Sequence, residues 1–316
     1  MKTNKWVFKT ATVLIAMVLL FSFSGAAQAK IVQVSESNIE VLLDGRKIAF
    51  PDDKPYMEGV RVMVPIRFVN HALGGKIQYD SNNGKKVTIE KGDRKIQLTI
   101  GSQTAYVNGK AQTFDAPMVI KGIRTYVPLR FISEALGVKV NWDQGGKWVW
   151  LGEKTVPNIE DLNVKQVEIE DVKDYFKNRE FFLSNPSRIA YQGAYIVDSK
   201  KDLPFRYGDF TIYDLTLLED SSKNQAVKIR LQMDGYKYTS PTIYYVTEKK
   251  IRIRGQIKGI DRLDQSGINI PTYLVASGED NYLNDDPDFL NFRIDEVIYV
   301  GLFLPGDMMI LIKNPF

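Results

Sequence analysis

The chain has 316 residues, of which 44% are hydrophobic, 25% charged and 11% aromatic, a composition typical of folded globular proteins. That length suffices for about two domains that each bury a core. The chain contains no Cys, which excludes disulfides, thiolate metal sites and a Cys nucleophile. It contains one histidine, His71, which excludes any site that needs two or three imidazoles.

Residues 1–29 have the pattern of a secretory signal peptide. Three lysines precede an apolar run from Ala11 to Phe23, and Ala27-Gln28-Ala29 places small residues at positions −3 and −1 of a cleavage site. The apolar run is short for a membrane span, which needs about 20 residues. We therefore expect cleavage before Lys30, a secreted or envelope-associated protein, and no membrane span after cleavage.

Charge is divided unevenly along the remaining chain. Residues 30–153 carry 18 basic and 13 acidic groups, or +5, whereas residues 154–316 carry 21 basic and 25 acidic groups, or −4. This balance is no evidence for nucleic-acid binding. A domain of charge +5 could bind an anionic envelope polymer, although a solvated surface of mixed charge explains the same counts.

A two-copy repeat organises the first half of the chain. The run VPIRFVNHALG at residues 64–74 recurs as VPLRFISEALG at residues 127–137, an offset of 127 − 64 = 63. Asp44-Gly45 precedes the first copy and Asn108-Gly109 the second, and such dipeptides favour the type I′ turns of tight β-hairpins. Self-similarity at a fixed offset marks a repeated supersecondary unit, here expected to be antiparallel strands plus one short helix.

Four residues recur at equal positions of the two predicted helices, and we expect all of them to be structural. They are Pro65, Phe68, Leu73 and Gly74 in the first copy, and Pro128, Phe131, Leu136 and Gly137 in the second. The proline fits the first helical turn, the Phe and Leu share one apolar face, and the glycine fits the left-handed stop. Helices this short need a sheet to pack on. Strands are predicted at 87–89, 96–100, 126–127, 138–142 and 148–151, which together give an α+β domain.

The second copy resembles the copper amine oxidase N-terminal-like domain, also called the stalk domain. The resemblance rests on the run TYVPLRFISEALG at residues 125–137, on Trp142-Asp143 after it, and on AYVNG at residues 105–109 before it. It covers about residues 31–153, so we assign residues 30–153 to this domain. The resemblance implies a non-catalytic extracellular module that projects from the proteins that carry it.

The resemblance does not imply amine oxidase activity. Those enzymes need three His ligands and a tyrosine in an Asn-Tyr-Asp/Glu motif, and the nearest match here, Asn281-Tyr282-Leu283, lacks the acid. One imidazole cannot assemble imidazole-bound copper. We predict no copper, no quinone and no other cofactor. His71 has Glu134 as its counterpart, away from the apolar face, and is expected to be a surface residue.

The second half is predicted to be a linker at 154–166 followed by a mainly β domain at 167–316 of no recognised family. Apolar residues at helical spacing between positions 169 and 176 predict one amphipathic helix over 167–178. The β runs that follow, without helices between them, favour a sandwich or open barrel. They lie at 194–197, 210–218, 227–233, 242–246, 251–257, 272–276, 294–304 and 308–312.

An acidic stretch is the weak candidate for a metal site. Glu279-Asp280-Asn281 is followed by Asp285, Asp286 and Asp288, and carboxylates on a loop suit Ca²⁺. The spacing is not that of an EF-hand, and a solvated, turn-forming loop is the alternative.

Two further patterns could support binding. Twelve of the 16 tyrosines follow residue 154, and exposed Tyr could stack on sugar rings, although Tyr is also common in strands; examples are Tyr236, Tyr238, Tyr244 and Tyr245. The run KKIRIR at residues 249–254 places cations on one strand face, which suits a polyanion or a half-buried strand.

These observations favour a secreted, non-catalytic cell-envelope protein in which a stalk-like module presents a β-rich binding domain. Its partner would be a cell-wall polymer, a polysaccharide or another envelope protein. The alternative is a secreted hydrolase of wall or polysaccharide that uses carboxylates in the C-terminal half. Two carboxylates about 5–10 Å apart in a cleft would favour the enzyme.

Overall fold

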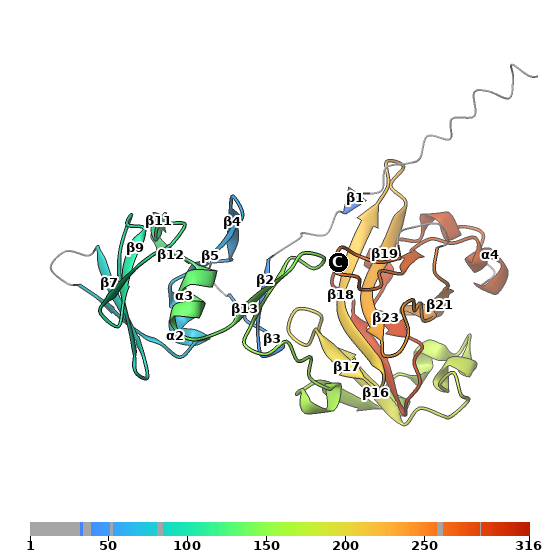
Figure 1. The fold of residues 1–316 in the computed structure, drawn as a ribbon. Helices are drawn as coiled ribbons and strands as arrows, with labels where there is room; N and C mark the ends of the chain where they lie inside the picture. Colours follow the sequence, from blue (N-terminus) through green and yellow to red (C-terminus); the bar gives the residue numbers. More distant parts are fainter. Residues whose placement is uncertain (1–31, 34–38, 51–52, 81–84, 258–261, 285) are drawn as a thin grey trace, which may run out of the picture.

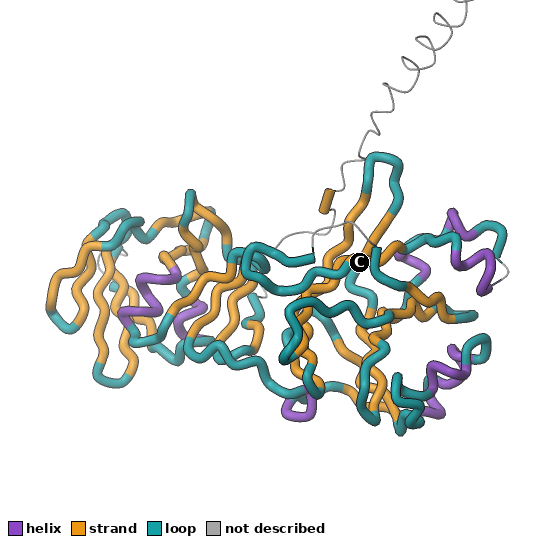
Figure 2. Tube along the Cα trace, turned by 45° about the vertical axis from the view of Figure 1, so that its right-hand side comes forward, coloured by secondary structure: helices purple, strands orange, loops and turns teal. Residues whose placement is uncertain are grey.

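The computed structural model describes residues 32–33, 39–50, 53–80, 85–257, 262–284 and 286–316. The predicted signal peptide therefore lies outside the described residues. The fold is mostly β and forms two lobes that lie side by side (Figure 1; Figure 2). We call residues 39–153 the N-lobe, and residues 32–33 with 154–316 the C-lobe. The expectation of a β-rich C-terminal region is confirmed.

The centre of the N-lobe is a four-stranded sheet in which the two sequence copies meet. Its order is β11 (Val119–Lys121), β12 (Arg124–Pro128), β5 (Arg61–Pro65) and β4 (Tyr56–Glu58). The antiparallel register of β5 and β12 pairs Val64 directly with Val127, its own counterpart 63 positions later. A pair of this kind places a local two-fold axis between the two strands.

Each outer sheet of the N-lobe combines strands from both copies. One contains β10 (Lys110–Thr113), β9 (Thr104–Val107), β8 (Arg94–Thr99), β7 (Lys86–Lys91) and β6 (Lys76–Tyr79). The other contains β13 (Val140–Asp143), β14 (Trp148–Leu151), β2 (Glu40–Leu43) and β3 (Arg46–Lys47). Most pairings are antiparallel, but β14 and β2 are parallel. The two copies are thus interlocked, because neither completes an outer sheet alone.

The predicted hairpin turns are present. Asp44 and Gly45 have φ of 48° and 81°, and Asn108 and Gly109 have φ of 50° and 79°. Both central residues of a type I′ turn require positive φ, which explains the dipeptides.

The two predicted helices are α2 (Arg67–His71) and α3 (Leu129–Ala135), and they lie together in the N-lobe (Figure 1). We predicted the two prolines in the first turns of these helices, and this prediction is wrong. Each proline is the last residue of a strand. The reason is that the sheet continues past Pro65, where the Ile66 N–H donates to the Thr125 carbonyl at 2.8 Å. Pro128 is the extended residue before α3.

The other recurring residues fit their expected places, with one difference in burial. Gly137 directly follows the C-cap of α3 with φ of 79°, and Gly74 lies one position further from α2 with φ of 68°. Phe68 is buried and stacks on Phe50, whereas Phe131 is only half-buried and stacks on Phe114 at 4.2 Å. Both leucines, Leu73 and Leu136, are buried.

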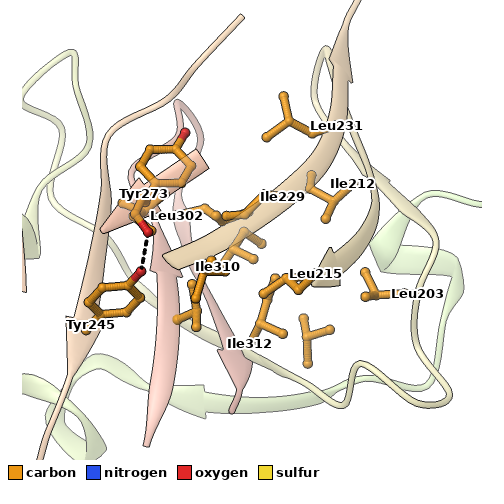
Figure 3. Close-up of a cluster of buried hydrophobic side chains, with 14 of the residues drawn as sticks. Leu203, Ile212, Leu215, Ile229, Leu231, Tyr245, Tyr273, Leu302, Ile310 and Ile312 are labelled. Atoms are coloured by element: carbon orange, nitrogen blue, oxygen red, sulfur yellow. Dashed lines mark hydrogen bonds between the residues drawn. The ribbon is translucent and has the colours of Figure 1, made fainter. Parts of the chain in front are cut away.

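The C-lobe has two sheets with one apolar cluster in common. The first contains β1 (Val32–Gln33), β18 (Phe210–Glu219), β19 (Gln225–Met233) and β22 (Thr272–Leu274), with β17 (Phe205–Tyr207) also paired to β18. The second contains β15 (Lys165–Glu168), β16 (Gly193–Val197), β24 (Met308–Lys313), β23 (Tyr299–Leu302), β20 (Ile243–Val246) and β21 (Ile251–Arg254). Figure 3 shows their side chains meeting, with Ile229 from the first sheet beside Leu302 and Ile310 from the second. The Tyr245 hydroxyl donates to the Tyr273 carbonyl across this cluster.

The predicted helix over 167–178 is wrong. Its first residues belong to β15, where Val167 pairs with Ala194, and the rest form two 3₁₀ turns, η2 (Ile169–Asp171) and η3 (Lys173–Phe176). Two of the apolar residues at helical spacing, Val172 and Phe176, do become buried, and the Phe176 ring packs edge-on against Tyr244 at 5.4 Å. A sheet ladder and an aromatic contact have replaced the helix that local periodicity favoured.

Short helical turns also occupy segments predicted as loop, linker or strand. They are α4 (Glu279–Asn284), η1 (Ile159–Asp161), η4 (Glu180–Leu183), η5 (Phe289–Asn291) and η6 (Ile294–Glu296). The acidic stretch thus begins in a helix, and the predicted strand at 294–304 is reduced to β23. Ile159, from the predicted linker, is fully buried in the C-lobe core.

Candidate functional site between the two lobes

The outer face of the β18–β19 hairpin is polar and faces the N-lobe. Leu215 and Ile229 point into the C-lobe core, so the residues beside them point outward. The register pairs Asp214 with Arg230, and Thr216 with Lys228. The ladder shifts by one residue at Tyr213, a β-bulge of the kind that redirects a side chain.

Arg230 joins the two lobes through a buried ion-pair cluster. Its Nη2 donates to both carboxylate oxygens of Asp143 at 2.8 Å, and its Nε donates to Asp264 at 2.5 Å. Ser266 donates its hydroxyl hydrogen to Asp143 at 2.7 Å. Arg230 is 4% exposed and Asp143 3% exposed. Burial alone would raise the pKa of the Asp143 carboxyl, but the hydrogen bonds from Ser266 and Arg230 hold it below its usual value.

Aromatic rings surround this cluster. Trp148 of the N-lobe packs on Tyr213 of the C-lobe, with ring centroids 6.2 Å apart. The Arg230 guanidinium lies 5.6 Å from the Trp148 ring and 5.1 Å from the Tyr213 ring, within cation–π range. Trp148 and Tyr213 belong to an apolar cluster that includes residues of both lobes. Its members are Leu42, Trp148, Trp150, Tyr213 and Ile268.

Two adjacent glycines allow the lobes to approach this closely. A Cβ at Gly145 would lie 2.3 Å from the Asp264 carboxylate, and a Cβ at Gly146 would lie 2.7 Å from Nη1 of Arg230. Sequence reasoning missed this junction. Its signal is the run WDQGGKWVW at residues 142–150, where an acid, two glycines and three tryptophans occur together.

A cleft of about 710 Å³ opens beside the junction. Its lining includes Glu40 and Lys47 from the N-lobe, Asp214 and Lys228 from the C-lobe, and the last residue, Phe316. Such a volume lies in the range of small-molecule sites. The C-terminus lies near the junction in Figure 1.

The cleft holds two groups with displaced pKa values. Burial raises the pKa of the Asp214 carboxyl, although the nearby Lys47 ammonium and the Leu215 N–H act the other way. Burial lowers the pKa of the Lys228 amine, which the Asp214 charge partly offsets. Lys47 also donates to the Ser199 carbonyl at 3.3 Å and lies 4.0 Å from the Glu40 carboxylate. An acid and an amine displaced in this way can exchange a proton, and they can also hold a polar ligand.

Of the three residues predicted to bind Ca²⁺, Asp286 forms ion pairs with basic side chains. Asp286 accepts a hydrogen bond from Arg252 at 2.5 Å and lies 3.6 Å from the Lys250 ammonium. Asp288 is exposed, and Asp285 lies outside the described residues. Within the described part of the chain, no group of three or more His, Cys, Asp or Glu side chains could hold a metal ion.

The basic strand is occupied by ion pairs inside the C-lobe. Arg252 and Arg254 are 6% and 1% exposed, and both contact the Asp280 carboxylate, which is itself 1% exposed. The two arginines of this strand are therefore turned inward as ion pairs, and the strand is more deeply buried than the half-buried alternative to a polyanion site. Among the tyrosines considered for sugar stacking, Tyr244 and Tyr245 are fully buried; Tyr236 and Tyr238 are exposed.

The match to a known protein family lies within the N-lobe. Residues 42–151 match the family model of the copper amine oxidase N-terminal domain, which confirms the resemblance over a segment that ends with β14. No curated protein matches the chain. Among the described residues, no helix is long and apolar enough to cross a membrane.

Proposed function

We propose that this chain is a secreted, non-catalytic cell-envelope protein in which a stalk-like N-lobe presents a β-sandwich C-lobe in a fixed orientation. The junction is the observation that carries the proposal. A module that only tethers its neighbour needs a flexible linker, whereas here a buried guanidinium, two carboxylates and a tryptophan connect the lobes.

Contacts outside the ion-pair cluster support a fixed orientation. Arg46, at the β2–β3 turn, donates to the Asp161 carbonyl at 3.2 Å. A Cβ at Gly45 in the same turn would lie 1.9 Å from the Thr155 carbonyl oxygen, so the turn packs tightly on the connecting segment. The N-lobe thus contacts the C-lobe at two places, which resists rotation about either one.

The proposal is tested by measuring the shape of the mature chain, residues 30–316, in solution. Small-angle X-ray scattering should give one elongated shape for the natural protein. Arg230→Met leaves Asp143 and Asp264 facing each other without their cation, and should broaden the distribution of distances between the lobes. Arg206→Met is the matched control, because Arg206 forms a pair with Asp234 that is largely exposed. A natural protein as flexible as the Arg230→Met variant would contradict the proposal.

Export is tested separately. N-terminal sequencing of the protein from the extracellular and envelope fractions should give Lys30 as the first residue. Recovery of the protein with residues 1–29 intact, or only from the cytoplasm, would contradict secretion.

A secreted hydrolase is the second candidate, because Asp214 combines a raised pKa with a place in the cleft near Glu40. Glycoside hydrolysis uses two carboxyl groups, one of which has a raised pKa. The test is release of reducing sugar from a panel of wall and plant polysaccharides. Activity that Asp214→Asn abolishes and the exposed Asp234→Asn leaves intact would establish the enzyme.

A further inference from the structure

The N-lobe has two grooves that occupy equivalent places in the repeat. Groove 1, of about 960 Å³, is bounded by the start of α2, β6 and the β11–β12 turn. Groove 2, of about 820 Å³, is bounded by the start of α3, β13 and the β4–β5 turn. Each groove is thus built from both sequence copies.

For eight of the described residues that line groove 1, the residue at the 63-residue offset lines groove 2. For groove residues between 65 and 79, the counterpart in groove 2 lies 63 positions later. For residues 123–125, the counterpart lies 63 positions earlier. The pairs are Pro65 with Pro128, Ile66 with Leu129, Arg67 with Arg130, Ile77 with Val140, Tyr79 with Trp142, Ile123 with Val60, Arg124 with Arg61, and Thr125 with Val62. The local axis between Val64 and Val127 exchanges these sets, so the grooves lie at opposite ends of the central sheet.

Burial follows the same symmetry. The strand residues of β5 and β12 have identical burial patterns. The two turn residues at the groove rims are strongly exposed, Val60 at 86% and Ile123 at 91%. The glycine before each has the same left-handed backbone, with φ of 62° at Gly59 and 61° at Gly122. Folding of an isolated hairpin does not require an exposed aliphatic tip, and here the tip is present twice.

Each groove combines one aromatic face with an excess of cations. Tyr79 is 53% exposed in groove 1, and Trp142 is 37% exposed in groove 2. Counting Lys and Arg against Asp and Glu, three cations face one acid in each groove, which gives 3 − 1 = +2 in both. They are Arg67, Lys76 and Arg124 with Asp53 in groove 1, and Arg61, Arg130 and Lys147 with Asp115 in groove 2.

This set of groups matches the chemistry of an acidic sugar. Aromatic faces stack on apolar sugar faces, and guanidinium groups hold carboxylates with two parallel hydrogen bonds. In each groove the acid pairs with one arginine and offsets one of the three cations. In groove 1, Arg124 and Asp53 are 2.5 Å apart and 25% and 31% exposed. Arg61 and Asp115 are 2.8 Å apart but 36% and 68% exposed, and an exposed pair contributes only about 0–1 kcal/mol.

We propose that the two grooves bind successive segments of one carboxylate-bearing glycan chain. Duplication of the site favours a repeating polymer over a single small ligand, because two grooves on one rigid domain convert the second contact into an intramolecular one. The net charge of +5 on residues 30–153 favours a polyanion in the same way. The inference goes beyond the proposed function, since it makes the N-lobe a binding element as well as a spacer.

The test uses the full mature chain and oligogalacturonates of increasing length, with polygalacturonate as the long probe. Calorimetry should show two short oligomers bound per chain. Oligomers long enough to reach both grooves should bind one per chain, at least about tenfold more tightly. An uncharged glucan and polyglutamate should both bind at least about tenfold more weakly, which separates the acidic sugar from charge alone.

Variants assign the binding to the grooves. Arg67→Ala with Tyr79→Ala removes groove 1, and Arg130→Ala with Trp142→Ala removes groove 2. Each double variant should keep one short oligomer per chain and lose the gain with length, and all four changes together should abolish binding. Tyr236→Ala with Lys237→Ala, an exposed pair on the C-lobe, is the matched control and should bind normally.

Each other outcome overturns the proposal. These are absence of binding, equal binding of polyglutamate, one site in place of two, a control variant as weak as the groove variants, or concentration-dependent self-association that hides the grooves. Circular dichroism checks that each variant folds. Should an alanine pair unfold, Arg67→Gln and Arg130→Gln keep the side-chain size while removing the charge. Because binding is measured on purified protein, its failure leaves the tests of export and rigidity unaffected.

Discussion

The two lobes bury different kinds of side chain. In the described part of the N-lobe, the buried polar residues are Ser133 and Asp143, and the side chains that donate to Asp143, Arg230 and Ser266, lie in the C-lobe. The C-lobe buries Arg230, Arg252 and Arg254 among others. The N-lobe therefore depends on apolar packing and turn geometry, whereas the C-lobe and the junction also depend on paired charges.

Apolar cores and buried ion pairs respond differently to pH and to substitution. Apolar burial is insensitive to pH, and its loss scales with the area and cavity created. A buried ion pair contributes little net stability, but removal of one partner leaves an uncompensated charge and is costly. The two lobes should therefore be destabilised by different substitutions and at different pH values.

The largest effect is expected for Asp280→Asn in the C-lobe. Asp280 is the common partner of Arg252 and Arg254, so its loss removes the carboxylate beside the buried Arg254 and leaves Arg252 paired with Asp286. We expect the free energy of unfolding of the C-lobe to fall by about 3–5 kcal/mol in chemical denaturation. Asp234→Asn, which breaks an exposed pair, should cost at most about 1 kcal/mol. Equal effects would mean that burial of the charges is not what distinguishes the C-lobe.

In the N-lobe the corresponding change is loss of a ring. Phe68→Ala should destabilise it by about 3–5 kcal/mol, because Phe68 is 4% exposed and packed in the core. Phe131→Ala should cost less, about 2–3 kcal/mol, since part of that ring already contacts solvent. His71→Ala, at the exposed end of α2, should stay within about 0.5 kcal/mol. A loss at His71 as large as that at Phe68 would refute the assignment of the helix faces.

Acid should open the junction before it unfolds the N-lobe. Asp143 has a lowered pKa in the folded state, so its contribution to stability is present above its unfolded pKa of about 4 and is lost as the pH falls through the folded value. Trp148 and Trp150 are fully buried beside Arg230 and report the change by fluorescence, in a Trp142→Phe background. Asp143→Asn should remove the acid transition. A transition that persists unchanged in this variant would assign it to other carboxylates.

Asp214 should respond to pH in the opposite direction. Its folded pKa is raised, so its favourable contribution is present below the unfolded pKa and is lost as the pH rises through the folded value. Asp214→Asn should therefore make the protein more stable than the natural chain at pH 7, and no more stable at pH 3. Thermal melting at the two pH values measures this difference.

The smallest effect is expected from copper. One imidazole cannot bind copper as an oxidase does, so the copper-loaded mature chain should release no hydrogen peroxide from primary amines and give no stain for a quinone. Copper binding alone is a weak criterion, since carboxylates or the terminal amine can take up the ion. Amine-dependent peroxide together with a stained quinone would overturn the non-catalytic interpretation of the N-lobe.

The N-lobe could be predicted from its sequence because its information is local. The dipeptides at Asp44 and Asn108 and the glycines that end the helices each act within a few positions, and the 63-residue repeat shows the same local signals twice. The repeat also holds the main residues of the two grooves, because their aromatic, arginine and glycine positions recur at the 63-residue offset. What the sequence could not show is that the two copies exchange strands, because register is a long-range property.

The junction and the C-lobe depend on partners that are distant in sequence. Arg230 and Asp143 are 87 residues apart, and Arg254 and Asp280 are 26 apart. Read locally, the alternating charges of the basic strand suit a polyanion site or a half-buried strand. The pairing with Asp280, which is distant in sequence, buries both arginines. The segment at 167–178 has helical periodicity for a similar reason, because its apolar residues meet aromatic rings that no local pattern reveals.

The strand β1 changes how the lobes are connected. Val32 and Gln33 pair with Glu219 and Leu218 at the edge of the C-lobe sheet, before the chain enters the N-lobe. The N-lobe is therefore an insertion, held by the polypeptide at both of its ends. A protease cut in the connection near Thr155 would leave the two pieces attached through β1, the junction and residues 34–38, so cleavage there need not release either lobe. Cleavage at the predicted site after Ala29 would keep β1, with Lys30 and Ile31 before it.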